Sequence, residues 1–340
     1  MKIKGFLYSI FLKTFLIIFI IIFFGTMFDN KSILVVENPI HEIISFVIIT
    51  LILLIIKKIC LKKIDNNTSL KKEIIIVSVI SIIFLTAQII YAYYMTMSPI
   101  WDWQNVLDSA RTYVMNGKDT VGWWYFEMFP NNNTLLYAEI ILYKLLKFFG
   151  LLSITKSMSI IVGINIILID LSIVFLYLTV RELFGKKNAI FSLIICVLSY
   201  AFYCYIPVLY TDTATMLFPI LMIFLYVKYN KNKNNKYLIL LAIASIIGYK
   251  LKPTVIITLV AIVIDFIFRN KPKEYYKGLI YLVSSFLIFF GIVYFMEVKL
   301  SIFPYDVKNN NKEIPYTHWI MMGMTEYDSY KKRKKVYRLV

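Results

Sequence analysis

IIIVSVISIIFLTAQIIYAYYMTM, residues 74–97, is an apolar run without a charged side chain, and a basic segment precedes it. An α-helix needs about 20 apolar residues to cross a bilayer. Similar runs, separated by short basic segments, recur along the 340 residues, of which 60% are hydrophobic. A soluble protein of this length would carry far more polar side chains. The sequence therefore predicts an all-α polytopic membrane protein.

Nine runs are predicted to cross the membrane. They are Phe11–Phe28, Pro39–Ile56, Ile74–Met97, Ile154–Val180, Ala189–Pro207, Thr213–Val227, Tyr237–Tyr249, Pro253–Phe268 and Leu279–Glu297. Because Lys and Arg are concentrated in cytoplasmic loops, the lysines before the first run place the N-terminus inside the cell membrane. Residues 1–298 then form a transmembrane bundle with a large outer loop at 98–153, and residues 299–340 are extracytoplasmic.

Residues 134–149 decide between two topologies, because this stretch is apolar but carries Lys144 and Lys147. If it crossed the membrane, three later basic clusters would lie outside. These clusters are 181–187, 228–236 and 269–277. If it lies in the interface, all three fall inside and only two lysines break the charge rule, from positions where they can snorkel. We therefore expect an interfacial helix within the outer loop.

The basic tail Lys331–Lys335 leaves two interpretations open. Under this topology it lies outside, although it would prefer the inside. Either the tail is an exception to the charge rule, or the chain stops short of a longer, active parent.

The net charge of +17 fits basic loops between spans, and the lysines form no single basic face. No nucleic-acid partner is therefore expected. The three cysteines show no metal-ligand spacing, so no metal ligands are assigned. The sequence indicates no certain cofactor and leaves a divalent metal open.

Charged residues gather on the predicted outer face. Asp102 follows the run 74–97 between two tryptophans, where it could be a general base or one member of an interfacial belt. Lys250 and Lys252 adjoin Pro253 between two apolar runs. Such cations could bind a lipid phosphate or snorkel to the interface. Likewise, Asp212 could orient a sugar hydroxyl or cap a helix.

The order of these features resembles the polyprenyl-phosphate-sugar-dependent glycosyltransferases of the GT-C fold. The resemblance is nearest to glycosyltransferase family 39, the protein O-mannosyltransferase group, in its Gram-positive bacterial type. The matching segments are Trp101–Trp103, 129–150, Arg181–Gly185, Tyr210–Asp212, Gly248–Pro253 and Pro315–Gly323. One departure is that Trp103 and Gln104 follow Asp102, where the family often has a second acid.

The resemblance implies a GT-C-like bundle that moves a sugar from a polyprenyl-phosphate donor to an envelope glycan, lipid or protein. It implies that Asp102 is the catalytic acid/base and that Lys250 and Lys252 bind the donor phosphate. The candidates for the remaining substrate contacts are Glu127, Asn131, Asp212 and His318.

Two other functions stay open. A transporter or flippase for a lipid-linked saccharide would have paired repeats and a polar site at the membrane midplane. The sequence shows no convincing repeat and offers Asp170 within the run 154–180. A non-catalytic partner in envelope polysaccharide assembly is the third hypothesis.

Overall fold

The computed structural model describes residues 9–10, 13–21, 39–59, 62, 64, 67–95, 97–269, 272–299, 312–315 and 317. Every regular element in these ranges is a helix, so the predicted all-α class is confirmed. The helices are α2 (Pro39–Ile59), α3 (Leu70–Tyr94), α4 (Trp101–Asn116), η1 (Lys118–Thr120), α5 (Trp123–Met128), η2 (Pro130–Asn132), α6 (Asn133–Phe148), α7 (Ile154–Phe184), α8 (Lys186–Leu198), α9 (Ala201–Cys204), α10 (Thr211–Asn232), α11 (Lys236–Leu251), η3 (Pro253–Val255), α12 (Ile256–Arg269) and α13 (Pro272–Lys299).

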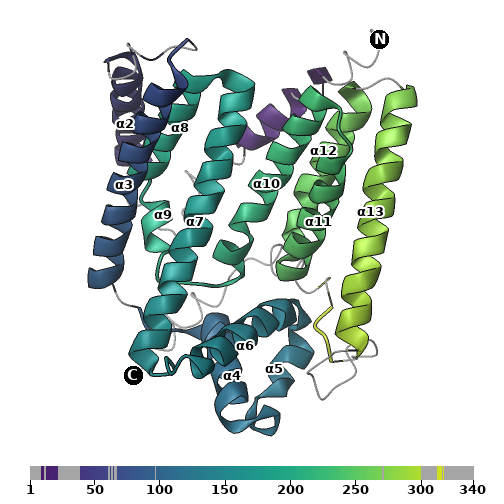
Figure 1. Ribbon diagram of the computed structural model, residues 1–340. Coiled ribbons are helices and arrows are strands. Elements are labelled where there is room, and N and C mark those ends of the chain that lie inside the picture. Colours follow the sequence, from purple (N-terminus) through teal and green to yellow (C-terminus); the bar gives the residue numbers. More distant parts are fainter. Residues whose placement is uncertain are drawn as a thin grey trace, which may run out of the picture.

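The long helices form a bundle, and α4, α5 and α6 form a cap at one of its ends (Figure 1). Within the bundle α7 packs against α8 and α10, and α11 packs against α10 and α13. Helix α6 lies across the ends of the bundle helices instead of alongside them (Figure 1). The connections at 149–153 and 205–210 meet the cap, because Leu151, Leu152, Val208 and Leu209 pack in its hydrophobic core.

Four described helices are long and apolar enough to cross a membrane. They are Leu70–Tyr94, Ile154–Phe184, Thr211–Asn232 and Tyr276–Lys299. The nine predicted crossings are therefore not confirmed, because α8, α11 and α12 are shorter. The first predicted span lies largely outside the described residues, of which 13–21 are helical.

One predicted span is wrong as a single helix. The run 189–207 breaks after Leu198 into a short helix and a series of turns. Backbone that leaves the helix in a bundle needs new hydrogen-bond partners. Asn165 of α7, which is fully buried, supplies them through its side-chain amide. Its Nδ2 donates to the carbonyl oxygens of Tyr205 and Ile206, each at 2.8 Å, and of Val208 at 3.1 Å.

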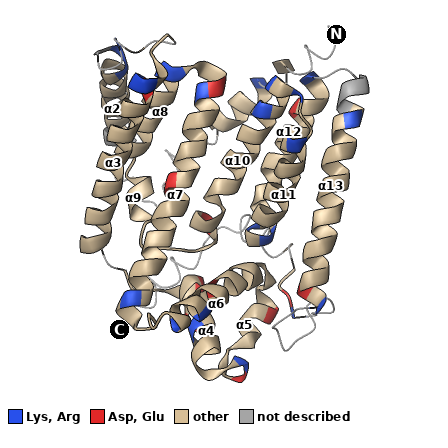
Figure 2. Cartoon of the chain, in the orientation of Figure 1, with Lys and Arg blue, Asp and Glu red and all other residues tan. Residues whose placement is uncertain are grey.

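Basic side chains gather at the end of the bundle opposite the cap (Figure 2). There Glu73 of α3, which is buried, accepts hydrogen bonds from Arg181 Nε at 2.5 Å and from Tyr177 Oη at 2.6 Å. Lys186 Nζ lies 3.5 Å from the same carboxylate. This network joins α3, α7 and α8, so the basic residues hold helices together at this end as well as carrying charge.

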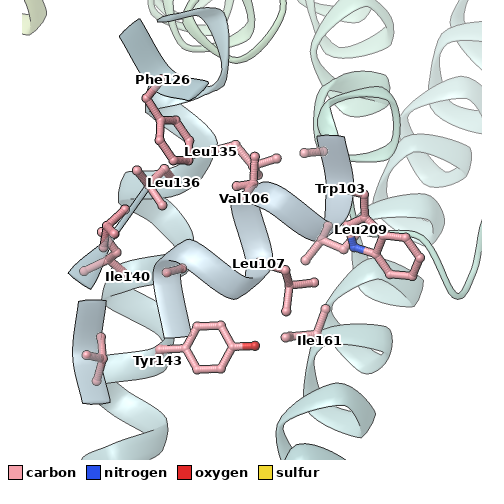
Figure 3. Close-up of a cluster of buried hydrophobic side chains, with 14 of the residues drawn as sticks. Trp103, Val106, Leu107, Phe126, Leu135, Leu136, Ile140, Tyr143, Ile161 and Leu209 are labelled. Atoms are coloured by element: carbon pink, nitrogen blue, oxygen red, sulfur yellow. The ribbon is translucent and has the colours of Figure 1, made fainter. Parts of the chain in front are cut away.

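The cap has its own hydrophobic core, which also anchors it to the bundle (Figure 3). In α4 the buried positions 103, 106, 107, 110 and 114 recur with helical spacing and face α6. From α6, Leu136, Ile140 and Tyr143 pack against them. Ile161 of α7 and Leu209 join the same cluster and tie the cap to the bundle.

One acid is enclosed in this core. Glu139 of α6 is 2% exposed, and neither of its carboxylate oxygens has a hydrogen-bond partner among the described residues. Burial raises the pKa of Glu139 well above the usual range for a carboxyl group. The folded protein therefore favours the neutral, protonated form of this side chain.

Candidate functional site

Asp102 lies in the first turn of α4, at the end of a row of hydrogen-bonding side chains. The Asp102 carboxylate faces the hydroxyl of Tyr125 from α5. Tyr125 Oη accepts a hydrogen bond of 2.7 Å from Asn132 Nδ2. Asn132 Oδ1 in turn accepts one of 2.9 Å from Tyr210 Oη. These side chains, Asp102, Tyr125, Asn132 and Tyr210, are called the Asp102 network below.

Both phenols of the network are held in their protonated form. Burial, followed by the neighbouring Tyr210 and Asp102, raises the pKa of Tyr125 far above its usual value. Burial and the Asp102 charge raise the pKa of Tyr210 to about 12. The Tyr125 hydroxyl thus lies close to both the Tyr210 hydroxyl and the Asp102 carboxylate. Tyr125 is 4% exposed, whereas Asp102 is exposed.

The two lysines near the end of α11 pair with acids from two different helices. Lys250 Nζ lies 2.6 Å from Glu297 Oε2 of α13 and 5.2 Å from the centre of the Phe290 ring. Lys252 pairs with Asp212 in the first turn of α10. Neither cation points freely into solvent, and together they fasten the end of α11 between α10 and α13.

Gly248 makes this arrangement of the lysines possible. A Cβ at this position would lie 2.8 Å from both Phe218 Cβ and Val255 Cγ1, closer than side chains pack. Only glycine therefore fits where α11 meets α10 and η3. This close approach fixes the turn that carries both lysines.

A polar pocket of about 190 Å³ lies between the cap and the bundle. Its lining includes Asn131 of η2, Lys250 of α11, Glu297 of α13 and Glu313. We call it the cap–bundle pocket. Asn131 precedes Asn132 of the Asp102 network, so one short backbone segment contributes to both features. The predicted residues Asn131 and Lys250 are brought together here.

Two further predicted residues, Glu127 and Asp212, do not line this pocket. Glu127 Oε2 accepts from Lys312 Nζ at 2.6 Å, and Asp212 pairs with Lys252. His318 lies outside the described residues. The residues missed from sequence are Tyr125, Asn132, Tyr210, Glu297 and Glu313. A tyrosine preceding Thr211-Asp212 and three consecutive asparagines at 131–133 were the visible signals.

An apolar groove of about 540 Å³ runs between α3 and α7. Its lining includes Met95, Met158, Gly163 and Pro207, and the linker residues Ser98 and Pro99 close its end near α4. We call it the α3–α7 groove. A Cβ at Gly163 would meet nothing within 4 Å, so this stretch of the wall faces open space. Ser98 and Pro99, which line the groove, lie shortly before Asp102 in the sequence.

Across the described part of the chain, no group of three or more His, Cys, Asp and Glu side chains could hold a metal ion. The polar groups described at this end of the bundle are carboxylates, phenol and amide groups, and paired lysines.

The comparisons with known proteins give one match. A family model described as "conserved hypothetical integral membrane protein" matches residues 2–338. No curated protein matches the chain, and no solved structure does. Because the matching model covers nearly the whole chain, this protein belongs to the conserved hypothetical integral membrane protein family.

Proposed function

We propose that this protein is a GT-C-like membrane glycosyltransferase that moves a sugar from a polyprenyl-phosphate donor to a cell-envelope acceptor. The transfer would take place at the cap end of the bundle, on the extracytoplasmic side. The observation that carries this proposal is the position of Asp102. Asp102 is an exposed carboxylate in the first turn of α4. Ser98 and Pro99, shortly before it in the sequence, line the apolar groove, and Asn131, next to Asn132 of the Asp102 network, lines the pocket that holds Lys250.

The proposed reaction uses these groups in one displacement. Asp102 accepts the proton of the acceptor hydroxyl while the oxygen of that hydroxyl bonds to the anomeric carbon of the donor sugar. The bond from that carbon to the phosphate oxygen breaks, and the phosphate leaves with the electron pair. Lys250 stabilises the charge that develops on the leaving phosphate. The α3–α7 groove would hold part of the polyprenyl chain.

The test is sugar transfer in proteoliposomes that contain radiolabelled polyprenyl-phosphate sugars and an envelope acceptor fraction. We expect Asp102→Asn to lower the rate by roughly 10²–10⁴, the usual cost of losing a general base. Asp119→Asn is the matched control, because Asp119 lies in η1 of the same cap and is exposed. Transfer at the wild-type rate by Asp102→Asn would refute this role for Asp102.

A second candidate function rests on one polar pair within the bundle. Gln88 Nε2 of α3 donates to Asp170 Oδ1 of α7 at 3.0 Å, inside two candidate spans. Acids at membrane depth are usually functional, and transporters bind substrates there. A flippase for a lipid-linked saccharide would move a fluorescent donor lipid between leaflets without transferring its sugar. Asp170→Asn would stop that movement, whereas Asp102→Asn would not.

A further inference from the structure

A polar stripe runs along α4 away from Asp102. Asn105, Asp108, Ser109 and Thr112 lie three, six, seven and ten residues after Asp102, which places them on one face of the helix. This face is distinct from the buried face that packs against α6. Together with residues 120–125 the stripe encloses a pocket of about 230 Å³, called the α4 pocket here.

The far wall of the α4 pocket is aromatic. Trp124 is 62% exposed, and its ring packs edge-to-face against Tyr125, with centroids 6.1 Å apart and an interplanar angle of 87°. A rigid, exposed indole offers a flat apolar surface beside polar groups. The position of this indole is restricted by Gly122, where a Cβ would already lie 3.3 Å from Trp124 Nε1.

The lining matches the chemistry of a saccharide. One face of a pyranose ring is made of C–H groups and stacks on an aromatic ring, while its hydroxyls need donors and acceptors around the edge. Asp108 supplies acceptors, Asn105 supplies both kinds of group, and Ser109 and Thr112 supply hydroxyls. Acidic sugars would be repelled by Asp108 and Asp102, so the lining favours an uncharged saccharide.

Tyr125 connects this pocket to the proposed chemistry, because it lines the pocket and its hydroxyl lies close to the Asp102 carboxylate. Along the axis of α4, Asp108 and Asp102 are about 9 Å apart at 1.5 Å per residue. A glycan that is bound at Asp108 can therefore extend toward Asp102.

We propose that the α4 pocket binds an uncharged saccharide, and that the acceptor of the reaction is a glycan in place of a protein or a lipid. That the bound saccharide is the acceptor rests on the proposed function, but saccharide binding itself can be measured without a donor. The Asp102 network and the α4 pocket then form one continuous acceptor path on α4 and α5.

The experiment measures binding of fluorescent neutral trisaccharides of glucose, mannose, galactose and N-acetylglucosamine to the full chain in mild detergent. We expect at least one to bind, and Trp124→Leu and Asp108→Asn each to weaken that binding at least tenfold. Trp124→Phe keeps an aromatic surface and should retain most of the binding. This variant distinguishes a loss of stacking from a loss of folding. Trp101→Leu and Asp119→Asn are matched controls that lie outside the pocket and should bind normally.

Each alternative result has a clear meaning. If none of the trisaccharides binds, or if the Trp124 and Asp108 variants bind as the wild type does, the saccharide pocket is refuted. Binding that a Ser- and Thr-rich peptide competes away would identify a protein acceptor and would also overturn the proposal. Specific glycan binding without any sugar transfer would support the pocket while contradicting the proposed transferase. Sugar transfer without saccharide binding at this pocket would support the proposed transferase and contradict the pocket.

Discussion

Replacing Asn132 by leucine is the sharpest test of the Asp102 network. Asn132 is 1% exposed and joins two phenols through hydrogen bonds of 2.7 and 2.9 Å. Leucine has a similar size but can make neither bond. A buried polar group left without a partner costs about 1–3 kcal/mol, so two such groups would cost about 2–6 kcal/mol. The Tyr125 and Tyr210 hydroxyls also interact with each other, so the expected loss lies near 2–3 kcal/mol.

Guanidinium unfolding in mild detergent can measure this loss by tryptophan fluorescence. Four of the five tryptophans, at positions 101, 103, 123 and 124, lie in the cap and report on its unfolding. Asn116→Leu is the control, because Asn116 ends α4, in the same cap, at an exposed position. An exposed substitution of this kind changes stability by about 0.5 kcal/mol or less.

Stability should recover when the two phenol hydroxyls are removed as well. If the loss comes from unpaired phenols, removing both hydroxyls from the Asn132→Leu protein should restore stability, because an apolar trio leaves no buried polar group unsatisfied. The triple variant Tyr125→Phe, Asn132→Leu, Tyr210→Phe should thus be more stable than Asn132→Leu alone. A triple variant less stable than the single one would refute the hydrogen-bond account.

Three further predictions follow from other features. Gly163→Leu should fill the α3–α7 groove and reduce crosslinking to a photoreactive polyprenyl phosphate at least fivefold; Gly291→Leu, which also enters open space in α13, should not. Because burial raises the pKa of Glu139, wild-type stability should fall as pH rises above the unfolded-state value of 4.5, and unfolding curves of Glu139→Gln should lack this slope. Finally, Lys250→Gln should raise the KM for the donor, whereas Glu297→Gln should lower it by removing a competing carboxylate; changes in the same direction would contradict phosphate binding at Lys250.

The sequence predicts most of the helices because a long apolar run indicates a segment that is buried or in contact with lipid. The bounds of α7 and α13 extend the predicted runs 154–180 and 279–297 by a turn or more, since helices continue into polar flanks. It could not predict the break after Leu198. The turns that follow this break are held by Asn165, whose side-chain amide donates from a different helix to the carbonyl oxygens of Tyr205 and Ile206.

The candidate site was only partly visible in the sequence. Asp102, Asn131 and Lys250 stand out because polar residues are rare between long apolar runs. Asn132 and Tyr210 lie in visible motifs, but their contact could not be predicted, because a buried asparagine between two phenols requires three segments to meet in space. The ion pair of Lys250 with Glu297 was hidden for the same reason, since the acid ends a helix far along the chain.

The carbonyl groups held by Asn165 have a mechanical consequence. Residues 205–208 are fixed to α7 by one side chain, and Pro207, in the middle of this segment, also lines the α3–α7 groove. The same segment leads directly into Tyr210, at the far end of the Asp102 network. A hydrocarbon chain entering the groove would press on the very residues that set the position of this tyrosine. If the groove holds the donor lipid as proposed, the backbone of residues 207–210 would link its arrival to the Asp102 network.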